Sequence, residues 1–162
     1  MCLRPSSIQP KIQPVEKADL YPDGSCDVQS GLGGWACLVK TEGGERWMSG
    51  QAYHTTNNRM ELTALLEGLL ALPSPARVQV HGDSQYLVRA FTENWLSNWA
   101  HSGWVTSGRT PVKNRDLWEA LLAQCQRHAL WLEWVRGHAG HRENEQADQL
   151  ALQRRRELER NS

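Results

Sequence analysis

The sequence predicts an α/β fold of three layers, in which helices cover both faces of a mixed five-stranded sheet. Three short stretches bounded by glycines follow one another early in the chain, which is typical of antiparallel hairpins. Apolar residues then recur at helical spacing. The remainder alternates between strand-like and helical patterns, so that helices can pack on both sides of the sheet. The predicted order of elements is βββαβααβα.

The first half of the chain supplies three strands and one helix. The strands are expected at residues 20–26, 35–41 and 46–53. Pro22 falls inside the first of them, and because proline has no amide hydrogen to donate, we expect that strand to bulge or end there. The helix is expected over residues 58–72, where Pro73 stops the apolar pattern.

The second half alternates between helices and strands. Its expected elements are a strand at 78–82, helical pieces over 86–99, a helix from 114 to about 128, a strand at 130–136 and a last helix from 143 to about 159. Asn114 is a residue type that caps helices, so we expect its side chain to begin the helix that follows it.

The length of 162 residues is usual for one domain. Pro5, Pro10 and Pro14 lie among polar residues, which predicts a flexible N-terminal tail over residues 1–17 and a folded domain over 18–160. No internal repeat is present.

Composition excludes several classes of protein. Eighteen basic and eighteen acidic residues cancel, so any binding of nucleic acid must depend on local charge. The four cysteines have neither the paired spacing of a zinc site nor the density of a disulfide scaffold, and we expect reduced thiols. The sequence has no apolar run of membrane-spanning length and no secretory signal, so we expect a cytoplasmic protein.

Four acidic residues fall where a predicted strand ends or a predicted helix passes the edge of the sheet: Asp23, Glu61, Asp83 and Asp148. Any one of them alone is more often a solvated surface residue. A group of carboxylates is costly unless a cation neutralises it, and oxygen ligands suit Mg²⁺ or Mn²⁺ better than zinc. Two such ions would serve hydrolysis of a phosphodiester.

Five short motifs carry a resemblance to a known family. They are Asp23-Gly24-Ser25-Cys26, the run from Thr55 to Leu62, Asp83-Ser84-Gln85-Tyr86, the segment from Pro111 to Trp118, and the segment from Trp134 to His141 that leads to Asn144-Glu145 and Asp148. In this order and spacing the sequence resembles type 1 ribonuclease H from residue 19 to about residue 152. The resemblance implies the ribonuclease H-like three-layer fold and a catalytic domain over residues 18–160.

The resemblance also implies a metal-dependent endonuclease that hydrolyses the RNA strand of RNA–DNA hybrids and leaves 3′-hydroxyl and 5′-phosphate ends. Asp23, Glu61, Asp83 and Asp148 would then be catalytic and would hold two Mg²⁺ or Mn²⁺ ions, with Asp23 between them. Pro22 bears on this expectation, because a changed strand end would displace the Asp23 carboxylate.

The resemblance assigns His138 a catalytic role in moving protons or releasing product. Taken alone, His138 is more typical of a surface loop histidine, and only the family resemblance reverses this preference. A zinc site on His138 and His141 is disfavoured, because no second pair of ligands completes it.

The resemblance further implies a set of substrate contacts. Cys26, Gln29, Asn57 and Gln85 would contact the RNA or the minor groove, where the 2′-hydroxyls distinguish a hybrid from DNA. In the same way, Thr56 and Asn114 would hold a phosphate of the DNA strand, and Trp95 would line the channel of that strand. For Asn57 and Asn58 a helix cap is an alternative interpretation that is compatible with substrate binding.

Three tryptophans, Trp95, Trp99 and Trp104, can pack a helical protrusion or offer flat surfaces to a nucleic acid. Packing is expected for most of them, and the resemblance implies that Trp99 and Trp104 support the shape of the protrusion. The better-known bacterial members carry a densely basic protrusion, but this chain has Ala100, His101, Ser102 and Val105 in its place.

The cations that remain near the protrusion are mainly Arg109, Lys113 and Arg115, so we expect modest affinity for the hybrid. The arginines at positions 154, 155, 156 and 160 are expected to complement the dipole of the last helix and to solvate its end.

Two other functions remain open from sequence alone. A catalytically silent module that binds hybrids would lack at least one of the carboxylates, and none is missing. A DNA-cutting nuclease of the same fold is the second alternative, although Asn57, Gln85 and His138 favour RNA. We expect the partner to be an RNA–DNA hybrid, the protein to act as a monomer, and no membrane to be involved.

Overall fold

The computed structural model describes residues 2–3, 14–135 and 141–161. Its elements are β1 (Cys2–Leu3), β2 (Lys17–Cys26), β3 (Gly33–Thr41), β4 (Gly44–Ala52), α1 (Asn57–Leu70), β5 (Arg77–Gly82), α2 (Gln85–Thr92), α3 (Trp95–Ser102), α4 (Arg115–Arg127), β6 (Ala129–Trp134) and α5 (Arg142–Asn161). The five predicted strands are confirmed, and β1 is an additional two-residue strand.

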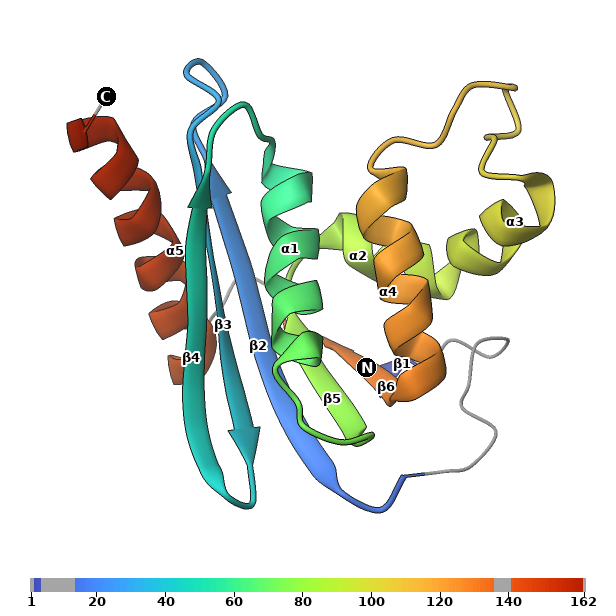
Figure 1. The fold of residues 1–162 in the computed structure, drawn as a ribbon, viewed down its shortest axis with the longest axis horizontal. Coiled ribbons are helices and arrows are strands. Elements are labelled where there is room, and N and C mark those ends of the chain that lie inside the picture. Colours follow the sequence, from blue (N-terminus) through green and yellow to red (C-terminus); the bar gives the residue numbers. More distant parts are fainter. Residues whose placement is uncertain (1, 4–13, 136–140, 162) are drawn as a thin grey trace.

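The strands form one mixed sheet in the order β1-β6-β5-β2-β3-β4. The hairpins β2–β3 and β3–β4 are antiparallel, whereas β5 lies parallel to both β2 and β6. Helix α1 packs on one face beside α4, and α5 packs on the other face across β2, β3 and β4 (Figure 1). The predicted three-layer arrangement is therefore confirmed.

The main core lies between the sheet and helices α1 and α4. Alternation along β5 turns Val78 and Val80 into this core, where they are at most 1% exposed. Leu62, Leu65 and Leu69 of α1 meet them and are fully buried. The spacing of these three leucines is the helical period from which the helix was predicted.

Strand β2 does not bulge or end at Pro22. It pairs with β3 from Ala18 to Cys26, with Pro22 opposite Cys37, and so runs four residues beyond Pro22. Its parallel pairing with β5 covers only Lys17 to Leu20. Beyond Leu20 strand β2 is paired on one side only, which is the setting in which a missing amide donor is tolerated.

Three further features differ from expectation. The helical pieces expected over residues 86–99 form two helices, α2 and α3, where the predicted element order had one, and Asn94 between them adopts a left-handed conformation with φ +54°. Asn114 occupies the N-cap position of α4 with φ +61°, but its side chain makes no capping hydrogen bond. Strand β1 lies within residues 1–17, where no regular structure was predicted, and pairs with the edge of β6.

In the part of the chain that the structure describes, Cys26, Cys37 and Cys125 are buried free thiols, as expected. No helix among these residues has the length and apolar composition needed to cross a membrane.

Candidate active site

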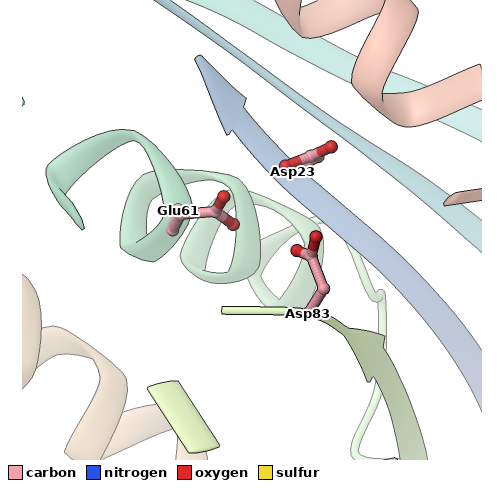
Figure 2. Close-up of side chains that lie close together, drawn as sticks. All are labelled: Asp23, Glu61 and Asp83. Carbon is pink, nitrogen blue, oxygen red and sulfur yellow. The ribbon is translucent and has the colours of Figure 1, made fainter. Parts of the chain in front are cut away.

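Three carboxylates converge at one end of the sheet. Asp23 lies in β2, Glu61 in the second turn of α1, and Asp83 directly after β5. One oxygen from each lies within 4.8 Å of the other two. Figure 2 shows the three side chains meeting from a strand, a helix and the end of the neighbouring strand. The sequence prediction for these three residues is thus matched by their geometry, and Pro22 does not displace Asp23.

Gly24 allows this approach. A Cβ atom at Gly24 would lie 2.6 Å from the backbone nitrogen of Glu61 and 2.7 Å from the carbonyl carbon of Met60. Only glycine therefore lets β2 touch α1 at this point. The contact lies beside both carboxylates, and the amide of Gly24 also donates to Asp23 Oδ1 at 2.8 Å.

The electrostatics of the cluster are those of crowded like charges. Asp23 is 3% exposed, and Glu61 and Asp83 are half-buried. Burial raises the pKa of Glu61 well above its usual value, and the charge of Asp23, a hydrogen bond with Asp23 and the charge of Asp83 raise it further. The cluster consequently favours whatever cation can compensate its negative charge.

The donor set fits a hard divalent cation. All three groups are carboxylates, and oxygen-only ligands suit Mg²⁺ or Mn²⁺, whereas zinc favours histidine and cysteine. The repulsion that raises the pKa of Glu61 is the cost that such a cation would offset.

Asp148 lies apart from this group. It is exposed in the second turn of α5 and does not belong to the set of mutually close carboxylates. The start of α5 is nevertheless held near the site, because Asn144 Nδ2 donates to the backbone oxygen of His81 at 2.9 Å, two residues before Asp83. Asp148 follows Asn144 by four residues and so lies on the same side of the helix. His138 lies outside the described residues.

The predicted RNA contacts lie around the start of α1 and neighbouring loops. Asn57 Oδ1 accepts a hydrogen bond from the amide of Cys26 at 2.8 Å, which ties the start of α1 to the end of β2. Thr56 caps α1 by accepting from the amide of Arg59, so the interpretation of Asn57 and Asn58 as the cap is wrong.

Two of the other predicted contacts are exposed. Gln29 lies in the turn between β2 and β3, and Gln85 is the first residue of α2. Both remain predictions as substrate contacts.

Asn114 belongs to a polar network between α1, α2 and α4. Its Oδ1 accepts from Arg59 Nη1 at 3.2 Å, and its Nδ2 donates to the hydroxyl of Tyr86 at 3.3 Å. Arg59 also binds both carboxylate oxygens of Asp116, at 3.0 and 2.8 Å. Sequence reasoning gave Arg59, Asp116 and Tyr86 no role, although all three lie within the motifs, because only the fold brings them together.

The tryptophans form one aromatic cluster. Trp99 lies 5.5 Å from Trp95, 6.3 Å from Trp104 and 5.6 Å from Trp118, measured between ring centroids. Trp104 is buried, and Trp95 is half-buried with the Arg89 guanidinium above its ring. The expected packing role of Trp99 and Trp104 agrees with this arrangement.

Two of the late arginines do more than solvate a helix end. Arg154 Nε donates to Ser49 of β4, and Arg155 Nη1 donates to Ser25 of β2, both at 3.0 Å. They hold α5 to the sheet, so the expectation of a purely solvating role is wrong for these two.

Comparisons with known proteins agree with this geometry. A family model described as RNase H matches residues 16–156. The chain is 49% identical over 138 residues to the protein named Ribonuclease H of Bordetella pertussis, covering 85% of this chain and 88% of that protein. The Ribonuclease H of Thermus thermophilus is also 49% identical over 138 residues, with 85% and 83% covered.

Solved structures give the same result. The crystal structure of LC9-RNase H1, described as a type 1 RNase H with the type 2 active-site motif, matches with a TM-score of 0.74 at 33% identity, covering 88% of this chain and 74% of that one. A foamy viral protease-reverse transcriptase in complex with dsDNA matches with a TM-score of 0.66 at 19% identity, covering 90% and 96%, which shows the fold alone. The chain belongs to the ribonuclease H family.

Proposed function

We propose that this protein is an endonuclease that hydrolyses the RNA strand of RNA–DNA hybrids and leaves 3′-hydroxyl and 5′-phosphate ends. One observation carries the proposal: Asp23, Glu61 and Asp83 bring an oxygen each within 4.8 Å of one another from three separate elements. The similarity to proteins named Ribonuclease H supports the hybrid as the substrate.

We propose two Mg²⁺ or Mn²⁺ ions as the cofactor of this site. Bound there, a pair of such ions supplies a nucleophilic water and neutralises charge on the phosphodiester. Asp23, Glu61 and Asp83 would hold the ions, and Asp148 would contribute from α5. The raised pKa of Glu61 supports this assignment, because a bound cation would offset the burial and the like charges that raise it.

The remaining assignments follow the family resemblance. His138 moves a proton or assists product release. Cys26, Gln29, Asn57 and Gln85 contact the RNA strand or the minor groove. Thr56 and Asn114 hold a phosphate of the DNA strand, and Trp95 lines its channel. The hydrogen bond from the Cys26 amide to Asn57 supports part of this scheme, because it presents two of these residues together.

We further propose that the protein acts as a monomer in the cytoplasm. The large exposed apolar residues in the described part of the chain are scattered rather than gathered in one element, which supports a monomer. The free thiols of Cys26, Cys37 and Cys125 suit a reducing compartment.

The decisive experiment compares wild type with Asp23→Asn on a labelled hybrid. We expect the variant to lose turnover by at least about a thousandfold, because it removes the most buried ligand, while circular dichroism reports an unchanged fold. Chelation of divalent cations should abolish cleavage by wild type. Near-normal Mg²⁺-dependent cleavage by Asp23→Asn would contradict the proposed site.

The choice of substrate decides between the alternatives. Wild type is given the hybrid, duplex RNA and duplex DNA of one sequence. Cleavage of the hybrid alone supports the proposal, cleavage of duplex DNA would make the protein a DNA-cutting nuclease, and binding without cleavage would make it a silent module.

A further inference from the structure

The Arg59 side chain determines how the amide of Asn114 is presented. Arginine can only donate hydrogen bonds, so the Asn114 atom that lies 3.2 Å from Arg59 Nη1 must be the oxygen. The guanidinium is itself held in place by two parallel bonds to Asp116. The oxygen of Asn114 is thereby occupied, and its NH₂ group is the part that remains for other partners.

Tyr86 supports the same orientation from the opposite side. Its hydroxyl accepts from Trp118 Nε1 at 2.9 Å, a nitrogen that can only donate. The Asn114 NH₂ group donates to that hydroxyl through Nδ2 at 3.3 Å, which uses one of its two hydrogens. Within the described residues, the second hydrogen of Nδ2 has no acceptor.

We propose that Arg59 is a positioning residue, which acts with Tyr86 to fix the Asn114 NH₂ group as a donor to a phosphate of the DNA strand. This inference rests on the proposed function and adds residues that do not themselves touch the substrate. A phosphate oxygen can only accept, so an amide turned the other way would present an oxygen to an anion and repel it. Because the charge of Arg59 is matched by Asp116, Arg59 contributes orientation rather than a free positive charge.

The location gives this orientation its importance. Arg59 belongs to the first turn of α1, which Thr56 caps, and Asn114 is the N-cap residue of α4. The network thus joins the two helix ends that carry the proposed phosphate ligands. Arg59 lies on the same helix as Glu61. The position of the DNA strand is therefore coupled to the position of the carboxylates.

The test combines a protein variant with a change in the substrate. Hybrids are prepared in which one DNA phosphate at a time is replaced by an uncharged methylphosphonate, and KM and kcat are measured for each. With wild type we expect one position at which KM rises about tenfold while kcat is nearly unchanged. Arg59→Met should raise KM of the unmodified hybrid by about the same factor. A methylphosphonate at the sensitive position should then cause no further rise in KM of this variant.

Two further variants separate positioning from folding. Tyr86→Phe removes only a hydroxyl and should give a smaller, few-fold rise in KM, with a correspondingly partial loss of the response to the methylphosphonate. Arg154→Met removes an arginine that binds a serine and a carboxylate far from the network, and it should respond to the methylphosphonate as wild type does.

The outcomes are distinct from those of the proposed function. If Arg59→Met raises KM but the methylphosphonate still raises KM of this variant by the same factor as in wild type, Arg59 does not position the phosphate ligand and the inference is overturned. The same holds if no phosphate is sensitive while wild type cleaves the hybrid. If wild type cleaves no hybrid at all, the proposed function itself is wrong.

Discussion

Gly24 is the residue on which the spacing of the site most depends. Replacing it with alanine places a methyl group 2.6 Å from the backbone nitrogen of Glu61, and backbone atoms cannot move aside as a flexible side chain does. Strand β2 must then separate from α1, which pulls Asp23 away from Glu61. For Gly24→Ala we expect a loss of about 1–3 kcal/mol in the free energy of unfolding, as is typical of overpacked sites. Denaturant unfolding measures this loss, and we expect hybrid cleavage to fall more than tenfold.

Gly43 offers a matched control for that substitution. A Cβ atom there would meet only Thr41 Oγ1, at an ordinary 3.7 Å. Gly43→Ala should therefore leave both the free energy of unfolding and the cleavage rate close to wild type. Equal behaviour of the two variants would show that the contact between β2 and α1 does not set the geometry of the site.

At the scale of elements, α5 brings the fourth carboxylate. Asp148 is exposed and does not belong to the close group of three, so it contributes less to holding a cation than Asp23 does. For Asp148→Asn we expect the Mg²⁺ concentration at half-maximal activity to rise by roughly tenfold, because one ligand charge is removed. Titrating Mg²⁺ against cleavage rate measures this shift. Excess Mg²⁺ should restore Asp148→Asn but not Asp23→Asn, and failure to restore it would place Asp148 on a par with Asp23.

The junction between α4 and β6 contains a buried histidine that couples stability to pH. His128 is 0% exposed, its Nδ1 accepts from the amide of Ala76 at 3.0 Å, and burial lowers its pKa to about 4. In the unfolded chain the His128 imidazole takes up a proton near pH 6.5, whereas in the folded protein it does so only near pH 4. The contribution of neutral His128 to the free energy of unfolding is therefore present above pH 6.5 and is lost as the pH falls toward 4.

Between about pH 7.5 and pH 5, we expect His128 to remove about 2 kcal/mol from the free energy of unfolding. The variant His128→Asn keeps an acceptor for the amide of Ala76 but does not titrate. Its stability should therefore decline less over this range, as measured by urea unfolding. Identical pH profiles for both proteins would rule out His128 as the cause.

The elements differ in how far the sequence could predict them. Periodicity located α1 because Leu62, Leu65 and Leu69 recur at helical spacing, which places them on the one face of the helix that is buried against the sheet. Periodicity located the core strands in the same way. Pro22 was misleading. A proline disrupts a strand that is paired on both sides, and whether β5 still pairs with β2 at Pro22 depends on the sheet order, which the sequence does not show. The position of the break at Asn94 was not predicted, because a left-handed residue leaves little trace in an apolar pattern.

The site shows the same division. Asp23, Glu61 and Asp83 were predictable as a group, because strand ends and an adjoining helix bring them to one edge. The network of Arg59, Asn114 and Tyr86 was not, because side-chain pairing between α1, α2 and α4 depends on distances that no spacing in the sequence encodes.

Across the whole molecule, acidic and basic residues cancel, so attraction to a polyanion depends on a few local cations. Near the protrusion, Arg109 and Lys113 are exposed, while Arg115 is paired with Glu119 and lies above the ring of Trp104. Ala100 and Ser102 on α3 are exposed without charge, and Val105 is 37% exposed. The protein therefore presents few free cations to a hybrid on this side.

This distribution predicts a shallow dependence of hybrid affinity on salt. Each phosphate contact adds about 0.9 to the slope of log affinity against log salt, so two or three contacts give a slope of about −2 to −3. Ala100→Lys and Val105→Lys should each steepen it by nearly 0.9 if α3 and its loop face the backbone. Leu70→Lys makes a comparable charge change at the far end of α1, where the side chain is 50% exposed, and should leave the slope unchanged. A wild-type slope as steep as that of a densely basic relative would mean that cations elsewhere, such as those of α5, carry the binding.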